Sequence, residues 1–188
     1  QYDLTTYLFY GTKKNTIAVK VDNSKQPNSR WYSGSGIYRN VWLTTVNKIH
    51  VVQWGTFITT PTVTNKLAVV NLSTQLKNYF SIGKPVTIKT LVFNAANKQV
   101  AVSQKTIQII PSGIDLNAEL PTVQQVINIV NPSLWTAEKP TLYKAITQIF
   151  LEDKMVDSYQ TSFGIRYFNF DVDKGFSLNG KPVKIVGV

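Results

Sequence analysis

The chain has 188 residues, 43% of them hydrophobic, and carries a formal net charge of +10 without a single cysteine. This size suffices for one large or two small domains, and the lack of cysteine excludes disulfide scaffolds, cysteine-ligated zinc sites and thiol catalysis. No run approaches the roughly 18 apolar residues of a membrane-spanning helix, so the sequence predicts no membrane partner.

The basic charge does not predict a nucleic-acid partner. Seventeen of the 20 basic residues are lysines spread along the chain, and the longest run is Lys13-Lys14. A phosphate-binding stripe needs a denser cluster, so the lysines indicate a solvated surface. The arginines Arg30, Arg39 and Arg166 lie instead in aromatic- or glycine-rich motifs, where arginine favours planar, partly buried pairs.

Alternation of apolar and polar residues predicts β-strands along most of the chain. The predicted strands cover residues 16–22, 67–76, 86–93, 99–110, 123–130, 142–152 and 155–163. Turn signals recur about every 8–12 residues, as is typical of an antiparallel sandwich, and no segment of ten or more residues shows a helical period. The predicted fold class is all-β, an immunoglobulin-like antiparallel β-sandwich.

The last ten residues predict a hairpin. Asn179-Gly180 favours the positive φ angles of a type I′ turn, and the β-branched run after it indicates a strand. A bare apolar strand edge invites aggregation, so a globular domain rarely ends on one. The pattern alone therefore leaves open what this strand pairs with.

Three motifs carry a family resemblance. They are "SRWYSGSGIYRNVWL" at residues 29–43, "NPSLWTAEKPTLY" at residues 131–143, and "FGIRYF" at residues 163–168 followed by "FSLNGKPVKIVGV". In this order and spacing they resemble glycoside hydrolase family 2, which contains β-galactosidases, β-glucuronidases and β-mannosidases. The resemblance extends over the whole chain.

The resemblance implies three parts. Residues 1–45 would be the C-terminal strands of a sugar-binding jelly roll, and residues 46–168 the immunoglobulin-like β-sandwich. Residues 169–188 would be the connector and the first strand of a (β/α)₈ catalytic barrel. The first and last parts are too small for cores of their own.

The resemblance also implies a function. Family members carry an Asn-x-His stretch after the first barrel strand, and barrel chemistry lies at the C-terminal ends of the strands. The chain would then be a non-catalytic fragment of a β-galactosidase-type hydrolase of β-linked saccharides, partnered by the remaining domains of its parent. A bacterial periplasmic or secreted location suits such an enzyme. The alternative is a free-standing carbohydrate-binding or adhesive immunoglobulin-like module.

The residues themselves offer no catalytic pair, cofactor site or metal site. A retaining glycosidase needs two carboxylates about 5–5.5 Å apart. The acidic residues at 152–157 and 171–173 fit solvated turns, and Glu138 fits a role in fixing its proline-flanked loop. His50 has no partner motif that would make it a triad member or a metal ligand.

Five residues are candidates for structural or binding roles. Trp135 is predicted to be largely buried as a loop anchor, with sugar stacking as the alternative. Arg39 is predicted to form a buried structural pair, and Arg166 belongs to the same class of motif residue. By resemblance, Arg30 and Trp31 lie toward the barrel mouth, where Arg30 would brace a domain interface or help form the substrate rim. Unpaired strand edges also predict possible self-association.

Overall fold

The computed structural model describes residues 2–25, 34–112 and 120–187, and all regular structure in them is β. The chain divides into two compact units, Gln1–Thr44 and Thr45–Val188. No helix in the described part of the chain is long and apolar enough to cross a membrane.

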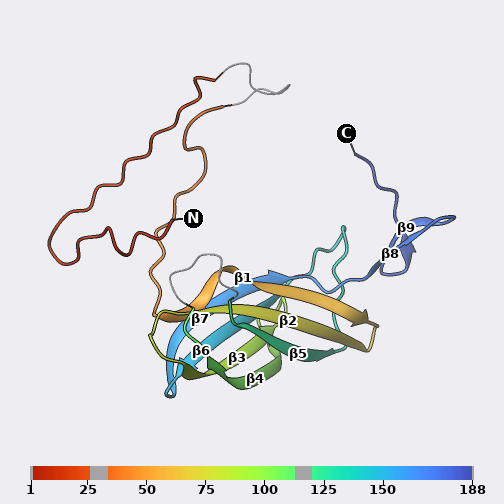
Figure 1. Cartoon of the computed structure of the whole chain (residues 1–188). Helices are drawn as coiled ribbons and strands as arrows, with labels where there is room; N and C mark the ends of the chain where they lie inside the picture. Colours follow the sequence, from red (N-terminus) through yellow and green to blue (C-terminus); the bar gives the residue numbers. More distant parts are fainter. Residues whose placement is uncertain (1, 26–33, 113–119, 188) are drawn as a thin grey trace. The chain divides into compact units, whose positions relative to one another are not determined.

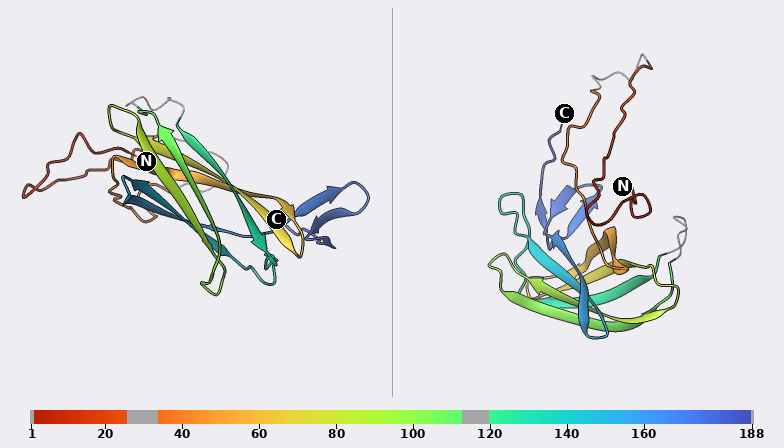
Figure 2. Two further views of the ribbon diagram at one scale, coloured as in Figure 1. Left: turned by 90° about the horizontal axis from the view of Figure 1, so that it is seen from below. Right: turned by 90° about the vertical axis from the view of Figure 1, so that its left-hand side faces the viewer.

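Seven strands of the second unit form two facing antiparallel sheets (Figure 1). The first sheet has the order β1-β2-β5 and consists of β1 (Ile49–Val63), β2 (Leu67–Asn78) and β5 (Thr122–Val130). The second has the order β4-β3-β6-β7 and consists of β3 (Lys84–Phe93), β4 (Gln99–Ile109), β6 (Tyr143–Leu151) and β7 (Lys154–Phe163). The strand axes of the two sheets are roughly aligned with one another, as in aligned sheet packing (Figure 2). The predicted all-β sandwich is confirmed.

A small third sheet follows the sandwich, with the order β10-β9-β8. It consists of β8 (Phe168–Asp171), β9 (Gly175–Leu178) and β10 (Lys181–Pro182). Asn179 and Gly180 connect β9 to β10 with φ angles of 50° and 78°, as the Asn-Gly signal predicts. The predicted strand beyond Pro182 is not formed. Because β9 has only four residues, it offers no partner to the chain beyond Val183, whose N–H donates to Phe176 O.

The first unit differs from the prediction. No described residue before Ile49 belongs to a hydrogen-bonded strand, so the strand predicted at residues 16–22 is absent. Its alternating apolar side chains, Ile17, Val19 and Val21, are each more than half exposed. Alternation marks a segment suited to one covered face, but a strand also needs a neighbour to complete its backbone hydrogen bonds.

Strand β1 has a large irregular bulge, which contacts β7. Val51 pairs with Leu76 and Thr56 with Thr74, so the β1 residues 52–55 face a single residue of β2. Within this bulge Trp54 has a φ of 57°, which is unusual for a bulky residue, and its side chain is 84% exposed. The bulge bends β1 and increases its local twist, as bulges do at sheet edges.

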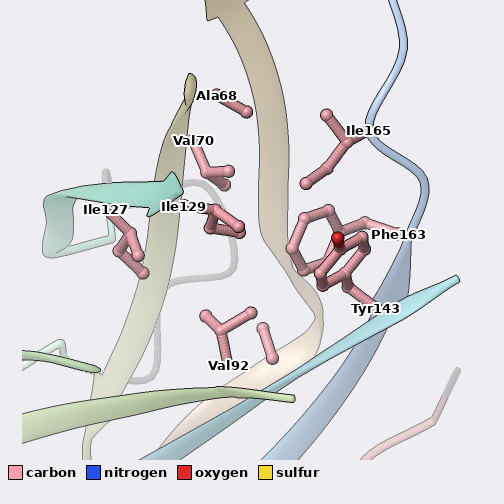
Figure 3. Close-up of a cluster of buried hydrophobic side chains, with 9 residues drawn as sticks. Ala68, Val70, Val92, Ile127, Ile129, Tyr143, Phe163 and Ile165 are labelled. Carbon is pink, nitrogen blue, oxygen red and sulfur yellow. The ribbon is translucent and has the colours of Figure 1, made fainter. Parts of the chain in front are cut away.

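The core fills the space between the two sheets with inward-facing apolar side chains. In β2 the residues predicted to share one face, Ala68, Val70, Leu72 and Leu76, are all buried. One apolar cluster, shown in Figure 3, contains Ala68, Val70, Val92, Ile127, Ile129, Tyr143, Ala145, Phe163 and Ile165. A second contains Ile49, Val51, Leu76, Val86, Ile88, Ile109, Val123 and Ile149.

A polar layer separates these two clusters. Each of four strands has a polar inward residue between the two clusters that is at most 3% exposed, beside the apolar Leu72 of β2: Thr74, Thr90, Gln125 and Thr147. The Thr90 hydroxyl donates to Gln125 Oε1 over 2.8 Å and lies 3.2 Å from the Thr147 hydroxyl. Gln125 Nε2 donates to Ser103 O over 3.3 Å. Alternation places Gln125 on the same strand face as Val123, Ile127 and Ile129, but the sequence does not show which groups this glutamine meets.

Two matched substitutions test the polar layer. Thr90→Val should lower the free energy of unfolding by about 1–3 kcal/mol, because it leaves the buried Gln125 Oε1 without its donor. Thr74→Val should be neutral or stabilising, because the buried Thr74 Oγ1 has no hydrogen-bond partner in the described part of the chain. Urea denaturation of the whole chain measures both, and equal losses would contradict the assignment.

Candidate functional site

The most elaborate local structure lies where the loop between β5 and β6, residues 131–142, meets the chain that leaves β7. Asn131 begins the loop with a φ of 49°, and its N–H donates to Lys66 O over 2.9 Å. Ser133 N–H donates to the hydroxyl of buried Tyr143 over 2.8 Å. Leu134 packs against the apolar cluster of Figure 3. The first residues of the loop are therefore tied to the sandwich.

Trp135, in the loop between β5 and β6, packs against the segment that follows β7. Its N–H donates to Ile165 O over 2.8 Å, and the Arg166 guanidinium lies 5.1 Å from its ring centre. A Cβ added at Gly164 would come within 2.9 Å of Trp135 Cβ and 3.0 Å of Cγ, so the close approach requires glycine. The motif residues Trp135 and Arg166 are thus in contact, although they are 31 positions apart in the sequence.

Burial of this anchor is less complete than the sequence predicts. Trp135 is partly buried rather than largely buried, and Leu142, at the end of the same loop, is 47% exposed. The physical reason is position, because the ring packs on the extended segment after β7 and not between the two sheets. The Arg166 guanidinium lies over one face of the ring.

The hairpin β9–β10 joins this contact through Asn179. Its side-chain Nδ2 donates to Trp135 O over 2.9 Å, and its Oδ1 accepts from Tyr167 N–H over 3.1 Å. Its own N–H donates to Tyr167 O over 2.9 Å. The turn residue Asn179 therefore binds both the loop between β5 and β6 and the segment between β7 and β8. The Asn-Gly signal alone did not reveal this role.

Glu138 is exposed at the tip of the loop. Its own backbone N–H and, to a smaller extent, the Thr136 hydroxyl lower the pKa of the Glu138 carboxyl, with a further weak contribution from the charge of Lys181. Thr136 and Lys139 close the tip, because Thr136 N–H donates to Lys139 O over 3.1 Å. The local hydrogen bonds agree with the loop-fixing role expected of Glu138.

The other candidate arginines do not lie at this site. Arg30 and Trp31 fall outside the described residues. Arg39 is exposed, and its guanidinium lies 5.4 Å from the ring centre of Tyr38. The predicted buried pair of Arg39 is not formed, because no paired strand covers this segment in the described structure.

The acidic residues have structural partners. Asp157 Oδ2 accepts from Val51 N–H over 2.7 Å, a bond between the two sheets that the solvated-turn interpretation missed. Glu152 and Asp153 form the β6–β7 turn, with φ angles of 50° and 62°. Asp171 Oδ1 accepts the N–H groups of two residues in the β8–β9 turn. In the described ranges no group of three or more His, Asp or Glu residues is placed to hold a metal ion.

His50 is also structural. It is 8% exposed, its Nδ1 lies 2.8 Å from Asn47 O, and its ring stacks on Tyr79 with centroids 5.9 Å apart. These contacts place it at the start of β1 rather than at a reactive site.

The β8–β9 hairpin presents aromatic side chains that the sequence analysis did not single out. Phe168 and Phe170 are 61% and 69% exposed, and the Phe170 and Phe176 ring centres are 5.0 Å apart. The signal was present in the spacing, because residues two apart share a strand face and Phe170 pairs with Phe176.

Comparison with known proteins places this architecture. The sequence model described as Glycosyl hydrolases family 2 matches residues 49–166, from the start of β1 to the Arg166 that covers Trp135. The chain belongs to glycoside hydrolase family 2. The junction of loop, connector and hairpin is thus a feature of a family 2 chain.

Relatives of this family 2 chain are much longer than it is. It is 42% identical over 187 residues to the beta-galactosidase BoGH2A of Bacteroides ovatus, covering 100% of this chain and 21% of that protein. It is 32% identical over 206 residues to a beta-glucuronidase of Formosa agariphila, covering 99% and 20%. A family 2 crystal structure from Bacteroides cellulosilyticus matches with a TM-score of 0.79 and 35% identity, over 89% of this chain and 22% of that one. The chain therefore spans about one fifth of these proteins.

Substitutions at the Trp135 contact test its contribution to this family 2 fold. Trp135→Ala should lower the free energy of unfolding by about 2 kcal/mol, below the roughly 3–5 kcal/mol of a fully buried aromatic residue, because the ring is only partly buried. Gly164→Ala should cost about 1–3 kcal/mol, because the new methyl group collides with the ring.

Gly83→Ala is the matched control for Gly164→Ala. An added Cβ there meets the end of the flexible Gln108 side chain at 2.9 Å, which can move away at little cost. Urea denaturation of the three variants measures the differences. A Gly164→Ala loss no larger than that of Gly83→Ala would show that the Trp135 contact is not tight.

Proposed function

We propose that this chain is a non-catalytic section of a glycoside hydrolase of the β-galactosidase type, which acts on β-linked saccharides. The supporting observation is that the whole chain matches about one fifth of a beta-galactosidase, with higher identity than to the beta-glucuronidase above. The acidic residues of the described sandwich bind backbone groups or form turns, which fits a supporting role rather than a catalytic one.

The proposed organisation follows the three parts of the sequence. Residues 1–45 contribute the last strands of a sugar-binding jelly roll, and residues 46–168 form the immunoglobulin-like domain. Residues 169–188 connect it to the (β/α)₈ barrel and begin the first barrel strand. The partners of the chain are then the remaining domains of the parent enzyme, and its extended N-terminal segment gains its neighbouring strands from the jelly roll.

In this role the sandwich acts as a rigid spacer. Its jelly-roll connection precedes β1 and its barrel connection follows β7, so the sandwich sets the separation between the sugar-binding and catalytic domains. Rigid placement matters for catalysis, because a displacement of about 1 Å at a reacting group can cost on the order of 10²-fold in rate. Arg30, next to Trp31, would brace the interface between the jelly roll and the barrel.

A chimera tests the proposed function. This chain should replace the matched 187-residue stretch of the Bacteroides ovatus beta-galactosidase and leave an enzyme that hydrolyses nitrophenyl β-galactoside. The chain alone should not hydrolyse the β-galactoside, β-glucuronide or β-mannoside above background, because its sequence carries no recognisable motif for a catalytic carboxylate pair.

Two results would contradict the proposal. One is a folded chimera without activity, and the other is turnover by the chain alone that disappears when one of its acidic residues is changed. Binding of a saccharide by the isolated chain, measured by calorimetry, would favour the alternative of a free-standing carbohydrate-binding module.

The isolated chain should also self-associate, because the partner domains that cover it in the proposed enzyme are missing. Phe168 and Phe170 are exposed on the short sheet, and β1, β5, β4 and β7 are sheet edges. Light scattering across a concentration series should show a mass that rises with concentration, and Phe168→Ser with Phe170→Ser should reduce the rise. A strictly monomeric mass at high concentration would contradict this prediction.

A further inference from the structure

We propose that Asn179 is a positioning residue that fastens the β8–β10 sheet to the sandwich, so that the two move as one body. The inference concerns the described chain itself. It rests on the proposed function only in its consequence, the direction in which the chain leads into a catalytic barrel.

The first argument is the use of both ends of one carboxamide. Asn179 Nδ2 donates to Trp135 O over 2.9 Å, and Oδ1 accepts from Tyr167 N–H over 3.1 Å. The first bond reaches 44 positions back in the sequence, to the loop between β5 and β6. The second reaches Tyr167 in the segment between β7 and β8. Only asparagine combines a donor and an acceptor at this length with tolerance of a left-handed backbone.

The second argument is that each partner of Asn179 is itself held. Trp135 N–H donates to Ile165 O, and Ile165 is fully buried in the apolar cluster of Figure 3. Asn179 N–H returns to Tyr167 O over 2.9 Å, which closes a hydrogen-bonded circuit through the loop, the end of the sandwich and the hairpin. A closed circuit restrains rotation, whereas a single bond would leave the hairpin free to turn about it.

The third argument comes from the neighbours of Asn179 in the turn. A Cβ added at Gly180 would lie 3.0 Å from Tyr167 Oη, so the turn backbone packs directly on the tyrosine. The charge of the next residue, Lys181, also contributes weakly to the lowered pKa of Glu138 in the loop between β5 and β6. The contact of Gly180 with Tyr167 crosses the same junction as the carboxamide bonds.

Comparison with another asparagine isolates what is special here. Asn97 also has a left-handed φ, 60°, in the turn between β3 and β4, and its N–H donates to Asn94 O within the same turn. Its side chain is exposed. Asn97 thus serves its own hairpin, whereas Asn179 serves its hairpin and also binds a separate loop.

The consequence concerns the chain after the hairpin. β10 ends at Pro182, and residues 183–187 continue directly from it. Under the proposed function this segment begins the first barrel strand. Asn179 would then set the direction in which the barrel departs from the sandwich.

Residual dipolar couplings of the 188-residue chain test the joint without any enzyme assay. In the wild-type chain one alignment tensor should fit the amides of β1–β7 and of β8–β10. Asn179→Gly keeps the positive φ at no strain but removes both side-chain bonds, so two different tensors should be needed. Asn97→Gly is the matched control and should behave as the wild type.

Asn179→Asp is a variant of intermediate effect, because it removes only one of the two side-chain hydrogen bonds. It keeps the acceptor for Tyr167 N–H but replaces the donor with a carboxylate oxygen that faces Trp135 O, so the hairpin should be partly released. The unfolding midpoint of the sandwich should change little in all three variants, which separates positioning from folding. A wild-type chain that needs two tensors, or an Asn179→Gly variant that needs one, would overturn the proposal.

The active chimera supplies the functional arm. There Asn179→Gly should lower kcat several-fold while changing KM less than twofold, because the barrel keeps its substrate contacts but loses its alignment with the sandwich. A chimera that is inactive, next to a wild-type chain that fits one tensor, would overturn the proposed function and leave the joint standing. An unchanged kcat would show that the joint does not position the barrel.

Discussion

The rest of the sandwich depends on one buried carboxamide, that of Gln125. It accepts a hydrogen bond from the Thr90 hydroxyl and donates one to Ser103 O, both in the opposite sheet. An apolar core alone tolerates small sliding of one sheet over the other, but a buried amide must meet its partners at one relative position. The polar layer therefore sets the register between the sheets, and the two apolar clusters on either side of it supply most of the burial.

The opposite edge of the sandwich is closed by side chains of β7. Asp157 accepts the N–H of Val51, and the hydroxyls of Thr56 and Thr161 lie 2.8 Å apart. The first bond satisfies the backbone N–H of Val51 in the edge strand β1, and the second joins two side-chain hydroxyls of β1 and β7. With Gln125 bound to β4 at one edge and Asp157 bound to β1 at the other, both open edges are tied, which makes the domain suitable as a rigid spacer.

Rigidity is carried from the sandwich to the chain that follows it by contacts of different kinds. Gly164 lets Trp135 lie against the backbone after β7, and Asn179 then binds the carbonyl of that same tryptophan. Packing fixes the loop, and directional hydrogen bonds fix the hairpin on the loop. The motif "NPSLW" and the motif "FGIRYF" are therefore two halves of one contact, because Trp135 of the first meets Ile165 and Arg166 of the second.

The sequence by itself determined strands β2 to β7 of the sandwich, the inward face of β2 and the Asn-Gly turn, because alternation and turn chemistry are local properties of neighbouring residues. It also named Trp135 and Arg166, which the fold brings together. Only the tertiary structure decided that β2 pairs with β5 and β3 with β6, that Gln125 bonds to the opposite sheet, and that Arg39 and residues 16–22 stay uncovered. The reason is that pairing and burial depend on residues far apart in the chain. A segment with a strand pattern becomes a strand only where another strand lies beside it.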